Sequence, residues 1–267
     1  MKVLIVDSHN MLHRARFGFG EGEHKVYFNF FKMLASEVKK HEADIVYIVD
    51  EGKPVQSLAL LESYKANRTK LNDPQFHREK TEVFESIKNF TGLAYVKHPK
   101  FECDDVIGHI ADVTHQGDDV TIVSTDTDFI QLLDDSGRVK LWNPVKKSFV
   151  EKWPVDYVIW KALKGDPTDN IPGIEGIGPK RAENLAGNAE KLKKFLSENE
   201  GTQEIFETAL KLVRLKKIDN EGIQVHQSSF SSESLQEEFS KRQINSILSR
   251  WNKWIEPLIR AGGKSAI

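Results

Sequence analysis

The sequence opens with MKVLIVDSHN at residues 1–10, and the fold can be worked out from this stretch outward. Val3 to Val6 form a short apolar run, and Asp7 follows it directly. A short run rich in Val and Ile, bounded by charged residues, is typical of a strand buried on both faces of a parallel sheet. The stretch therefore predicts a central strand that ends in an acid.

Similar runs recur through the first half of the chain. They predict strands at residues 45–49, 94–96, 120–123 and 139–142. Between them, apolar residues repeat at helical spacing over residues 26–40, 79–90 and 104–113. Strands that alternate with helices imply right-handed crossovers. The predicted fold class is therefore α/β, with a mostly parallel central sheet flanked by helices.

The second part of the chain has a different character. From about residue 155 strand signals become scarce, and Gly and Pro cluster over residues 165–179. Helical patterns follow at residues 190–196, 202–217 and 240–259. The polar, serine-rich segment 221–234 is expected to be a surface loop. We predict an α/β domain at residues 1–154, a C-terminal helical region at 155–260 packed against it, and a frayed end at 261–267.

The composition excludes several classes of protein. The longest apolar runs are a few residues, whereas a membrane span needs about 20. The start of the chain lacks the apolar core of a signal peptide. Cys103 is the only cysteine among the 267 residues, which excludes a disulfide framework and a multi-cysteine metal site. We therefore expect a cytoplasmic protein without membrane contact. The formal charge of −2 by itself indicates no polyanionic partner.

Acidic residues recur where the predicted strands end and helices begin. The predicted set has nine members: Asp7, Asp50, Glu102, Asp104, Asp105, Asp126, Asp128, Asp166 and Asp169. Ligand sites of open α/β sheets lie outside the carboxyl ends of the strands, so we expect these carboxylates to converge. Like charges about 4 Å apart repel by about 1 kcal/mol per pair even in water, so cations must neutralise them. Oxygen-only ligands favour Mg²⁺, with Mn²⁺ as a substitute, and so many acids predict two ions.

Several members of this set have a simpler alternative interpretation. Asp104 and Asp105, in the first turn of a predicted helix, can serve only as partners of the helix dipole. Asp126 and Asp128 can cap a helix at residues 129–133. The two strand-end acids have no such structural reason, and the set is a stronger signal than any member of it.

Two further segments carry basic or glycine-rich patterns. Residues 53–80 contain six Lys or Arg against three Asp or Glu and no strand pattern, which is typical of a lid or binding loop. The stretch GIEGIGPKRA, residues 173–182, predicts a tight turn with Pro179 at the first helical position and Lys180 and Arg181 beside exposed backbone N–H groups. Such a turn binds phosphate without reading bases, although an ordinary helical hairpin is the alternative.

The motifs resemble those of the 5′-nuclease superfamily, which comprises flap endonucleases, bacteriophage 5′→3′ exonucleases and the N-terminal nuclease domain of bacterial DNA polymerase I. The similarity covers about residues 1–190 and rests on KVLIVDSHN, YKANR, FECDDVIG, STDTDFIQLL and GDPTDNIPGIEGIGPKRA. It implies a PIN-like sheet with a helical arch at about residues 51–80. It also implies a helix–three-turn–helix module, of the helix-hairpin-helix type, that binds DNA at about residues 165–190.

The resemblance further implies roles for individual residues. Around a first metal ion it places Asp7, Asp50, Glu102, Asp104 and Asp105, and around a second Asp126, Asp128, Asp166 and Asp169. Lys65 would reach the scissile phosphate and Arg68 a neighbouring one, Tyr64 would stack on a terminal base, and Arg14 would contact phosphate. The backbone at Gly173, Gly176 and Gly178 would hold the duplex, together with a bound K⁺ ion in relatives.

Two positions depart from the family pattern. Ser57 stands where relatives usually carry an Arg, so one phosphate contact is missing or comes from Lys53. Thr127 stands where a Lys is common, which changes the charge beside the second metal but keeps the acids on either side.

Together these features predict a metal-dependent 5′→3′ exonuclease and flap endonuclease. It would hydrolyse phosphodiester bonds near 5′ ends of DNA, and of RNA in RNA/DNA duplexes, by a two-metal mechanism in replication and repair. The expected partners are DNA with 5′ ends, nicks or flaps and a single-stranded-DNA-binding protein, and the enzyme is expected to be a monomer. Setting the nine site acids aside from the 40 Asp and Glu leaves 31 against 38 Lys and Arg, a basic exterior that suits such a substrate.

Three other functions are alternatives to this one. A DNA-binding protein of the same fold with weakened catalysis is the strongest, and the complete acid set argues against it. A haloacid-dehalogenase-type phosphatase needs a second acid where His9 stands. A PIN-type ribonuclease would lack the glycine turn and the YKANR motif.

Overall fold

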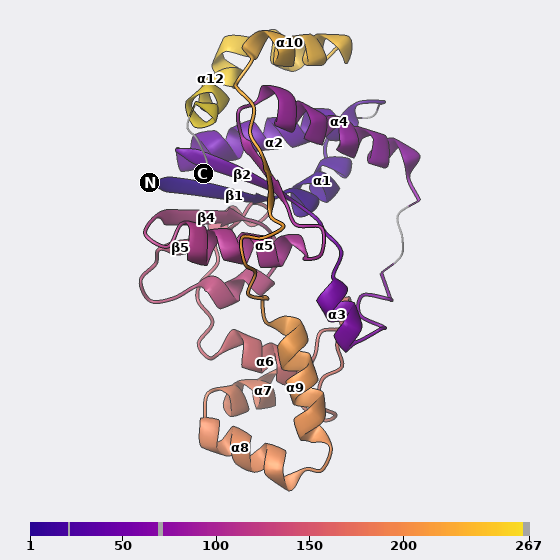
Figure 1. Ribbon diagram of the computed structural model, residues 1–267, viewed down its shortest axis with the longest axis vertical. Helices are drawn as coiled ribbons and strands as arrows, with labels where there is room; N and C mark the ends of the chain where they lie inside the picture. The colour runs from indigo at the N-terminus through magenta and orange to yellow at the C-terminus, as the bar shows by residue number, and fades with distance from the viewer. Residues whose placement is uncertain (21, 69–71, 264–267) are drawn as a thin grey trace.

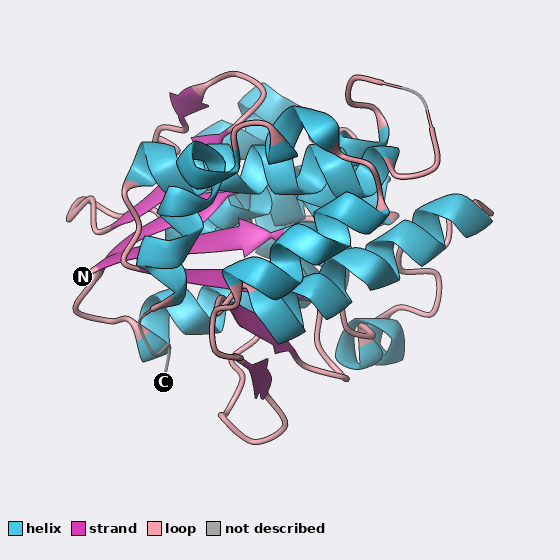
Figure 2. Cartoon of the chain, turned by 90° about the horizontal axis from the view of Figure 1, so that it is seen from above, coloured by secondary structure: helices cyan, strands magenta, loops and turns pink. Residues whose placement is uncertain are grey.

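The computed structural model describes residues 1–20, 22–68 and 72–263. At its centre lies a seven-stranded sheet with the strand order β6-β5-β4-β1-β2-β3-β7 (Figures 1 and 2). Its strands are β1 (Lys2–Asp7), β2 (Ile45–Asp50), β3 (Ala94–Lys97), β4 (Asp119–Val123), β5 (Val139–Asn143), β6 (Ser148–Phe149) and β7 (Gln224–His226). The five strands β1 to β5 are parallel, and β6 and β7 pair antiparallel at the two edges. The predicted α/β class with a mostly parallel sheet is confirmed.

Alternate residues of β1 face opposite layers of helices, as the period of a strand requires. Leu4 and Val6 join the core under α1 (Ser8–Arg16), α2 (Lys25–His41) and α4 (Pro74–Phe90). Val3 and Ile5 face the other layer. That layer consists of α5 (Cys103–His109), the π-helical turn η1 (Ile110–Thr114) and the 3₁₀ turn η2 (Asp128–Leu132). Both faces of β1 are buried, which explains why its sequence is a continuous apolar run.

A second group of helices extends from one end of the sheet and has an apolar core of its own (Figure 1). It contains α6 (Tyr157–Lys164), the 3₁₀ turn η3 (Pro167–Asp169), α7 (Pro179–Ala186), α8 (Ala189–Glu198) and α9 (Thr202–Val213). The segment that follows β2 reaches this group through the short helix α3 (Val55–Leu60) and the buried ring of Tyr64. The chain between β2 and α4 therefore spans the space between the sheet and these helices.

The rest of the C-terminal half returns to the sheet. The strand β7 pairs with β3, and α10 (Ser232–Lys241), α11 (Asn245–Leu248) and α12 (Trp251–Gly262) join the core that contains α2. The predicted surface loop at 221–234 is therefore wrong, because it contains an edge strand and the start of α10. All three residues of β7 are exposed, so the strand left no apolar pattern in the sequence. The helical region predicted at 155–260 is likewise divided between two cores.

The remaining expectations can be placed on the structure. Trp251 is 7% exposed, and Trp254 packs partly buried against the same core. The predicted arch at 51–80 consists of α3, turns through Arg68, and the start of α4, while residues 69–71 lie outside the described residues. The predicted frayed end starts inside α12, and residues 264–267 of it are not described. Within the described ranges no helix combines the length and apolarity that a membrane crossing requires.

Candidate metal centre

The carboxyl edge of the sheet brings together the acids that the sequence placed at strand ends. Asp7 ends β1 and Asp50 ends β2, and these two strands are parallel neighbours. Asp126 follows β4, which pairs with β1 on its other side. The predicted convergence of the strand-end acids is thus a direct result of the parallel pairing.

Asp7 has a structural and an electrostatic role at this edge. One of its carboxylate oxygens accepts a hydrogen bond from the backbone N–H of Asn10 (3.0 Å) and so caps α1, and the other accepts from the Ser124 hydroxyl (2.7 Å). Burial raises the pKa of Asp7 to about 6, and the nearby Asp126 carboxylate adds to the rise. A carboxylate in this position is destabilised by its surroundings unless a cation joins it.

Asp104 and Glu51 both have Asp7 as an electrostatic neighbour. Burial, with the charges of Asp126 and Asp7, raises the pKa of Asp104 well above its ordinary value. Burial raises the pKa of Glu51 to about 7, and the charge of Glu102 contributes to the rise. We call Asp7, Glu51, Asp104 and Asp126 the strand-end cluster. Because like charges raise one another's pKa here, an added cation would stabilise these carboxylates.

Glu51 was missed by the sequence analysis. It directly follows the acid that ends β2, and an acid next to a strand-end acid is the signal that could have identified it. Asp50 itself is held by cations: Lys97 Nζ is 2.9 Å away, Lys80 Nζ is 3.5 Å away, and the Tyr95 hydroxyl donates to it (2.7 Å). Burial alone would raise the pKa of Asp50, but Lys80 and Lys97 hold it below its usual range.

A second group of acids lies beside the first. Asp128, Asp166 and Asp169 each present a carboxylate oxygen, and these three oxygens lie within 4.8 Å of one another. We call them the helix-turn cluster, because they come from η2, from the residue before η3 and from η3. Asp126 joins the two groups, since its carboxylate accepts a hydrogen bond from the backbone N–H of Asp128 (2.9 Å).

The helix-turn cluster contains a cation that the sequence analysis missed. Lys161 on α6 is 7% exposed, and its ammonium group forms ion pairs with Asp128 and with Asp166 (2.7 Å). Burial alone would lower the pKa of Lys161, but these two carboxylates raise it above its ordinary value. Lys161 belongs to the buried face of α6 with Val158 and Ala162, and a charged residue within an apolar stripe is a signal of pairing.

The YKANR segment is anchored to η3. The backbone N–H of Lys65 donates to the carbonyl oxygen of Asp169 (2.9 Å), and Asn67 Nδ2 donates to that of Pro167 (2.6 Å). Lys65 adopts a left-handed conformation (φ 57°), which an L-residue takes only when its surroundings hold it. This anchoring directs the Lys65 and Arg68 side chains toward the acids.

Lys65 bridges the site acids of α5 and η3. Its ammonium group forms an ion pair with Glu102 and lies 3.5 Å from Asp169, and Arg68 also pairs with Asp169. Although burial favours the neutral amine, the Glu102 carboxylate raises the pKa of Lys65 well above its ordinary value. Lys65 is therefore a permanent cation at the border of the two acid clusters.

Three predicted site residues interact with other parts of the protein. The ring of Tyr64 is 6% exposed within the core, which leaves no face for stacking on a base, and its hydroxyl donates to Glu102 (2.9 Å). Asp105 accepts a hydrogen bond from the backbone N–H of Lys216 (2.7 Å), so it holds the chain that leaves α9. Arg14 is half-buried on α1, and its electrostatic neighbour is Glu37 of α2.

The predicted glycine turn leads into α7. Gly178 precedes α7, and Pro179 is its first residue. Ile174 and Ile177 are buried and hold the turn, while a side chain added at Gly176 or Gly178 would meet no atom within 4 Å. The backbone at these two glycines is therefore open to solvent. Lys180 and Arg181 are exposed beside them, and Gly173 packs too closely on the Lys164 carbonyl (2.2 Å from an added Cβ) for any side chain.

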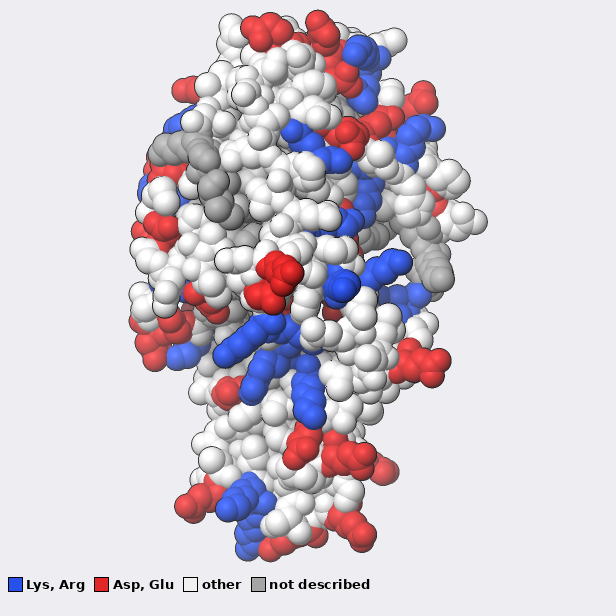
Figure 3. Space-filling view, in the orientation of Figure 1, with Lys and Arg blue, Asp and Glu red and all other residues white. Residues whose placement is uncertain are grey.

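A cavity of about 410 Å³ lies over the helix-turn cluster and is lined by Asp126, Lys161, Arg68 and the three acids of that cluster, among others. Figure 3 shows Lys and Arg side chains gathered across the middle of one face, between the sheet and the helices α6 to α9. Cations thus surround a strongly acidic centre, which is the charge arrangement of a site for a phosphate chain and metal ions.

Comparisons with known proteins agree with this geometry. The family described as "5'-3' exonuclease, N-terminal resolvase-like domain" matches residues 2–159. A 5′-3′ exonuclease of Aquifex aeolicus is 32% identical over 198 residues, which are 69% of this chain and 66% of that protein. A thermostable DNA polymerase I of Thermus thermophilus is 31% identical over 216 residues, 74% of this chain. The chain spans 25% of the length of that polymerase.

Solved structures share the fold. The T5 5′-exonuclease, solved with bound divalent zinc ions, has a TM-score of 0.66 and 26% identity over 80% of this chain and 90% of its own. The catalytic core of Rad2, solved with a DNA substrate, has a TM-score of 0.62 over 97% of this chain and 92% of its own, but at 14% identity it supports the fold alone. The sheet, the acids at its carboxyl edge and these matches lead to one conclusion: the chain belongs to the 5′-3′ exonuclease family of the 5′-nuclease superfamily.

Proposed function

We propose that this protein is a metal-dependent, structure-specific 5′→3′ exonuclease and flap endonuclease that hydrolyses phosphodiester bonds near 5′ ends of DNA. The observation that carries the proposal is the pair of acid clusters at one edge of the sheet, bordered by Lys65, Arg68 and Lys161. Family membership and the divalent ions reported in the T5 5′-exonuclease support it. The proposal includes RNA in RNA/DNA duplexes, since the contacts proposed for Lys65 and Arg68 are to phosphates, which DNA and RNA share.

The acids fit two divalent ions, Mg²⁺ with Mn²⁺ as a substitute. One ion would be held by Asp7, Glu51 and Asp104 with Asp50 and Glu102, and the other by the helix-turn cluster with Asp126. The raised pKa values of Asp7, Asp104 and Asp128 mark the charge that the ions neutralise. When bound, the ions acidify water and stabilise negative charge on the phosphate. Asp105, bonded to the chain at Lys216, supports α5 from behind.

Lys65 supplies fixed positive charge where negative charge grows on the scissile phosphate. Its pairing with Glu102 and Asp169 holds the ammonium group in place before the substrate arrives, so little reorganisation is needed during reaction. Arg68 holds a neighbouring phosphate. The Tyr64 hydroxyl orients Glu102, and no covalent protein intermediate is required.

Away from the metal ions, the glycine turn is proposed to hold the nucleic acid. The open backbone at Gly176 and Gly178, with Lys180 and Arg181, holds the duplex strand as a helix–three-turn–helix module at about residues 165–190, together with a K⁺ ion. Arg14 adds a phosphate contact. The enzyme acts as a monomer in the cytoplasm of a bacterium, or of the bacterial host if a phage encodes it. It acts in replication and repair, with a single-stranded-DNA-binding protein as a partner. The bacterial exonuclease and polymerase relatives support this setting.

The proposal is tested with a 5′-flap duplex labelled at its 5′ end. Asp126→Asn combined with Asp128→Asn should abolish Mg²⁺-dependent cleavage while the variant still binds the substrate. The matched control is Asp134→Asn combined with Asp135→Asn, which removes two exposed acids a few residues away and should cleave normally. Unchanged turnover in the first variant would contradict the two-metal assignment.

A further inference from the structure

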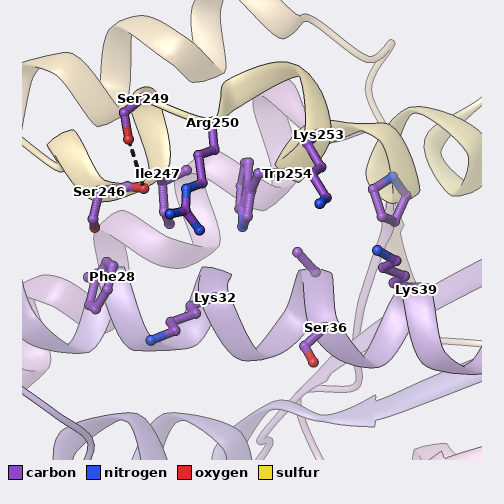
Figure 4. Close-up of a pocket in the computed structure, with 12 residues that line it drawn as sticks. Phe28, Lys32, Ser36, Lys39, Ser246, Ile247, Ser249, Arg250, Lys253 and Trp254 are labelled. Atoms are coloured by element: carbon purple, nitrogen blue, oxygen red, sulfur yellow. Dashed lines mark hydrogen bonds between the residues drawn. The ribbon is translucent and has the colours of Figure 1, made fainter.

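A groove of about 630 Å³ lies between α2 and the helices α11 and α12 (Figure 4). It lies on the helical layer that covers one face of the sheet. The acid clusters instead lie at the carboxyl edge of the sheet, with Asp7 at the end of β1, Asp128 in η2 and Asp169 in η3. None of the residues that line the groove belongs to the candidate metal centre. The groove therefore needs an explanation of its own.

The charges of the groove have one sign. Lys32 and Lys39 contribute from α2, Arg250 and Lys253 contribute from the start of α12, and the lining includes no Asp or Glu. None of these four cations forms an ion pair with a carboxylate in the described part of the chain. In a protein with a net charge of −2, four unpaired cations around one groove favour an anionic occupant.

The floor of the groove is apolar. Ala35, Ile247 and Pro257 line it together with Phe28 and Trp254. In Figure 4, Trp254 and Arg250 both extend from α12 toward α2, with their nitrogen atoms leading. The indole N–H of Trp254 is buried and has no acceptor among the described residues. The groove is thus lined by a residue whose hydrogen-bond donor has no partner there.

The start of α12 adds a second feature that favours an anion. Arg250 occupies the N-cap position and provides no side-chain cap, so the first N–H groups of this twelve-residue helix have no side-chain acceptor from the cap. The positive end of the helix dipole thus lies at the groove, beside two of its cations.

The aromatic residues favour a peptide over single-stranded nucleic acid. Base stacking needs a free ring face. Trp254 is packed against Phe239 and Trp251 (ring centroids 5.0 and 5.3 Å away), and Lys32 Nζ lies over the Phe28 ring (5.4 Å). An apolar side chain needs only a cavity, which the groove offers.

We propose that the groove between α2 and α11–α12 docks an acidic peptide segment of a protein partner, with large apolar side chains of the peptide inserted between the cations. Lys32 and Lys39 are two turns apart on α2, roughly 10 Å along its axis, so acids on either side of a short apolar pair match the groove. The inference does not depend on the hydrolytic activity, because no residue of the groove belongs to the proposed site.

The test uses fluorescence anisotropy with the full chain and a labelled peptide, Glu-Asp-Leu-Phe-Asp-Glu. Wild type should bind it in a salt-dependent manner. Lys32→Glu combined with Arg250→Glu should weaken binding by at least about tenfold. Ser36→Trp, which fills the exposed groove wall without changing its charge, should also weaken it. The control, Lys140→Glu combined with Lys146→Glu, changes two exposed lysines elsewhere and should bind as wild type. All variants should cleave a flap substrate normally.

Two results would overturn the proposal. One is a peptide that does not bind, or that binds the groove variants as well as it binds wild type. The other is a groove variant that loses affinity for single-stranded oligothymidylate while the peptide shows no specific binding, which would assign the groove to nucleic acid.

Discussion

The two acid clusters of the site are neutralised in different ways. In the strand-end cluster, Asp104 has Asp7, Glu51 and Asp126 as electrostatic neighbours. Among the described residues no Lys or Arg forms an ion pair with any of these four acids. In the helix-turn cluster, Asp166 and Asp128 share the buried ammonium group of Lys161, and Asp169 pairs with Arg68. The first cluster therefore depends on an added cation, whereas the second carries its own counterions.

This difference indicates how the two parts of the site respond to metal. Without a divalent ion the strand-end carboxylates raise one another's pKa, so protons replace the missing charge. In the helix-turn cluster an arriving ion has to compete with Lys161 for the same oxygens. We expect the strand-end cluster to bind a divalent ion more tightly and the helix-turn cluster to bind it more weakly.

The largest loss of activity is expected at one of two adjacent acids of α5. Asp104→Asn should lower the cleavage rate of a flap substrate by at least about a thousandfold, because it removes a metal-facing charge worth several kcal/mol. Asp105→Asn should cost little activity, because an amide oxygen can still accept the hydrogen bond from Lys216. Single-turnover kinetics of both variants will show whether the two acids differ, and equal losses would contradict the division made here.

The second largest loss of activity is expected at Lys65, which lies at the border of the two clusters. Lys65→Ala should slow the chemical step by about a hundredfold, the usual cost of losing one group that stabilises transition-state charge. Its effect on substrate affinity should be much smaller. Single-turnover rates and binding measured in Ca²⁺ will separate the two quantities. A loss confined to affinity would remove the catalytic role of Lys65.

In the helix-turn cluster we expect a smaller effect, and there the substitution should strengthen metal binding. Lys161→Met removes the internal counterion, so the weaker of two Mn²⁺ sites should bind about tenfold more tightly in a calorimetric titration. Lys164→Met is the control and should leave the titration unchanged, because Lys164 lies in the same helix over the Trp160 ring and has no carboxylate partner among the described residues. An unaltered affinity in Lys161→Met would show that Lys161 does not compete with the ion.

The smallest effect concerns the pH dependence of stability. The folded pKa values of Asp7 and Glu51 are raised from 3.8 and 4.5 to about 6 and 7. For an acid with a raised pKa, the stabilising contribution of the proton is present at low pH and is lost as the pH rises through the folded value. Metal-free protein should therefore lose stability from these groups between about pH 4 and pH 7.

Thermal melting with and without Mg²⁺ checks this expectation. The gain in Tm on adding the ion should be small near pH 5 and a few degrees near pH 7, because the ion binds the ionised cluster. Other titrating groups, such as Asp50 with its lowered pKa, change the Tm in both conditions. Subtracting the Tm without Mg²⁺ from the Tm with Mg²⁺ at each pH removes their contribution. The combined variant Glu51→Gln with Asp104→Asn should flatten the difference, and a gain independent of pH would contradict the account of the strand-end cluster.

Much of the site followed from local features of the sequence. Buried parallel strands produce continuous apolar runs, so the ends of β1 and β2, and with them Asp7 and Asp50, could be located without a structure. Gly176, Gly178 and Pro179 likewise specify a tight turn that leads into a helix, because their backbone preferences act within a few residues.

Other parts of the molecule depend on contacts between residues far apart in the chain. Lys161 became part of the site because α6 places it against Asp128, and the Tyr64 ring became core because its segment docks on α6 to α9. The edge strand β7 carries no apolar pattern and exists because β3 offers it a partner. The sequence by itself determined that the acids at the ends of β1 and β2 would lie at one edge of the sheet, since the period and the ends of strands are local. Only the tertiary structure decided which cations balance them, since that depends on where separate helices pack.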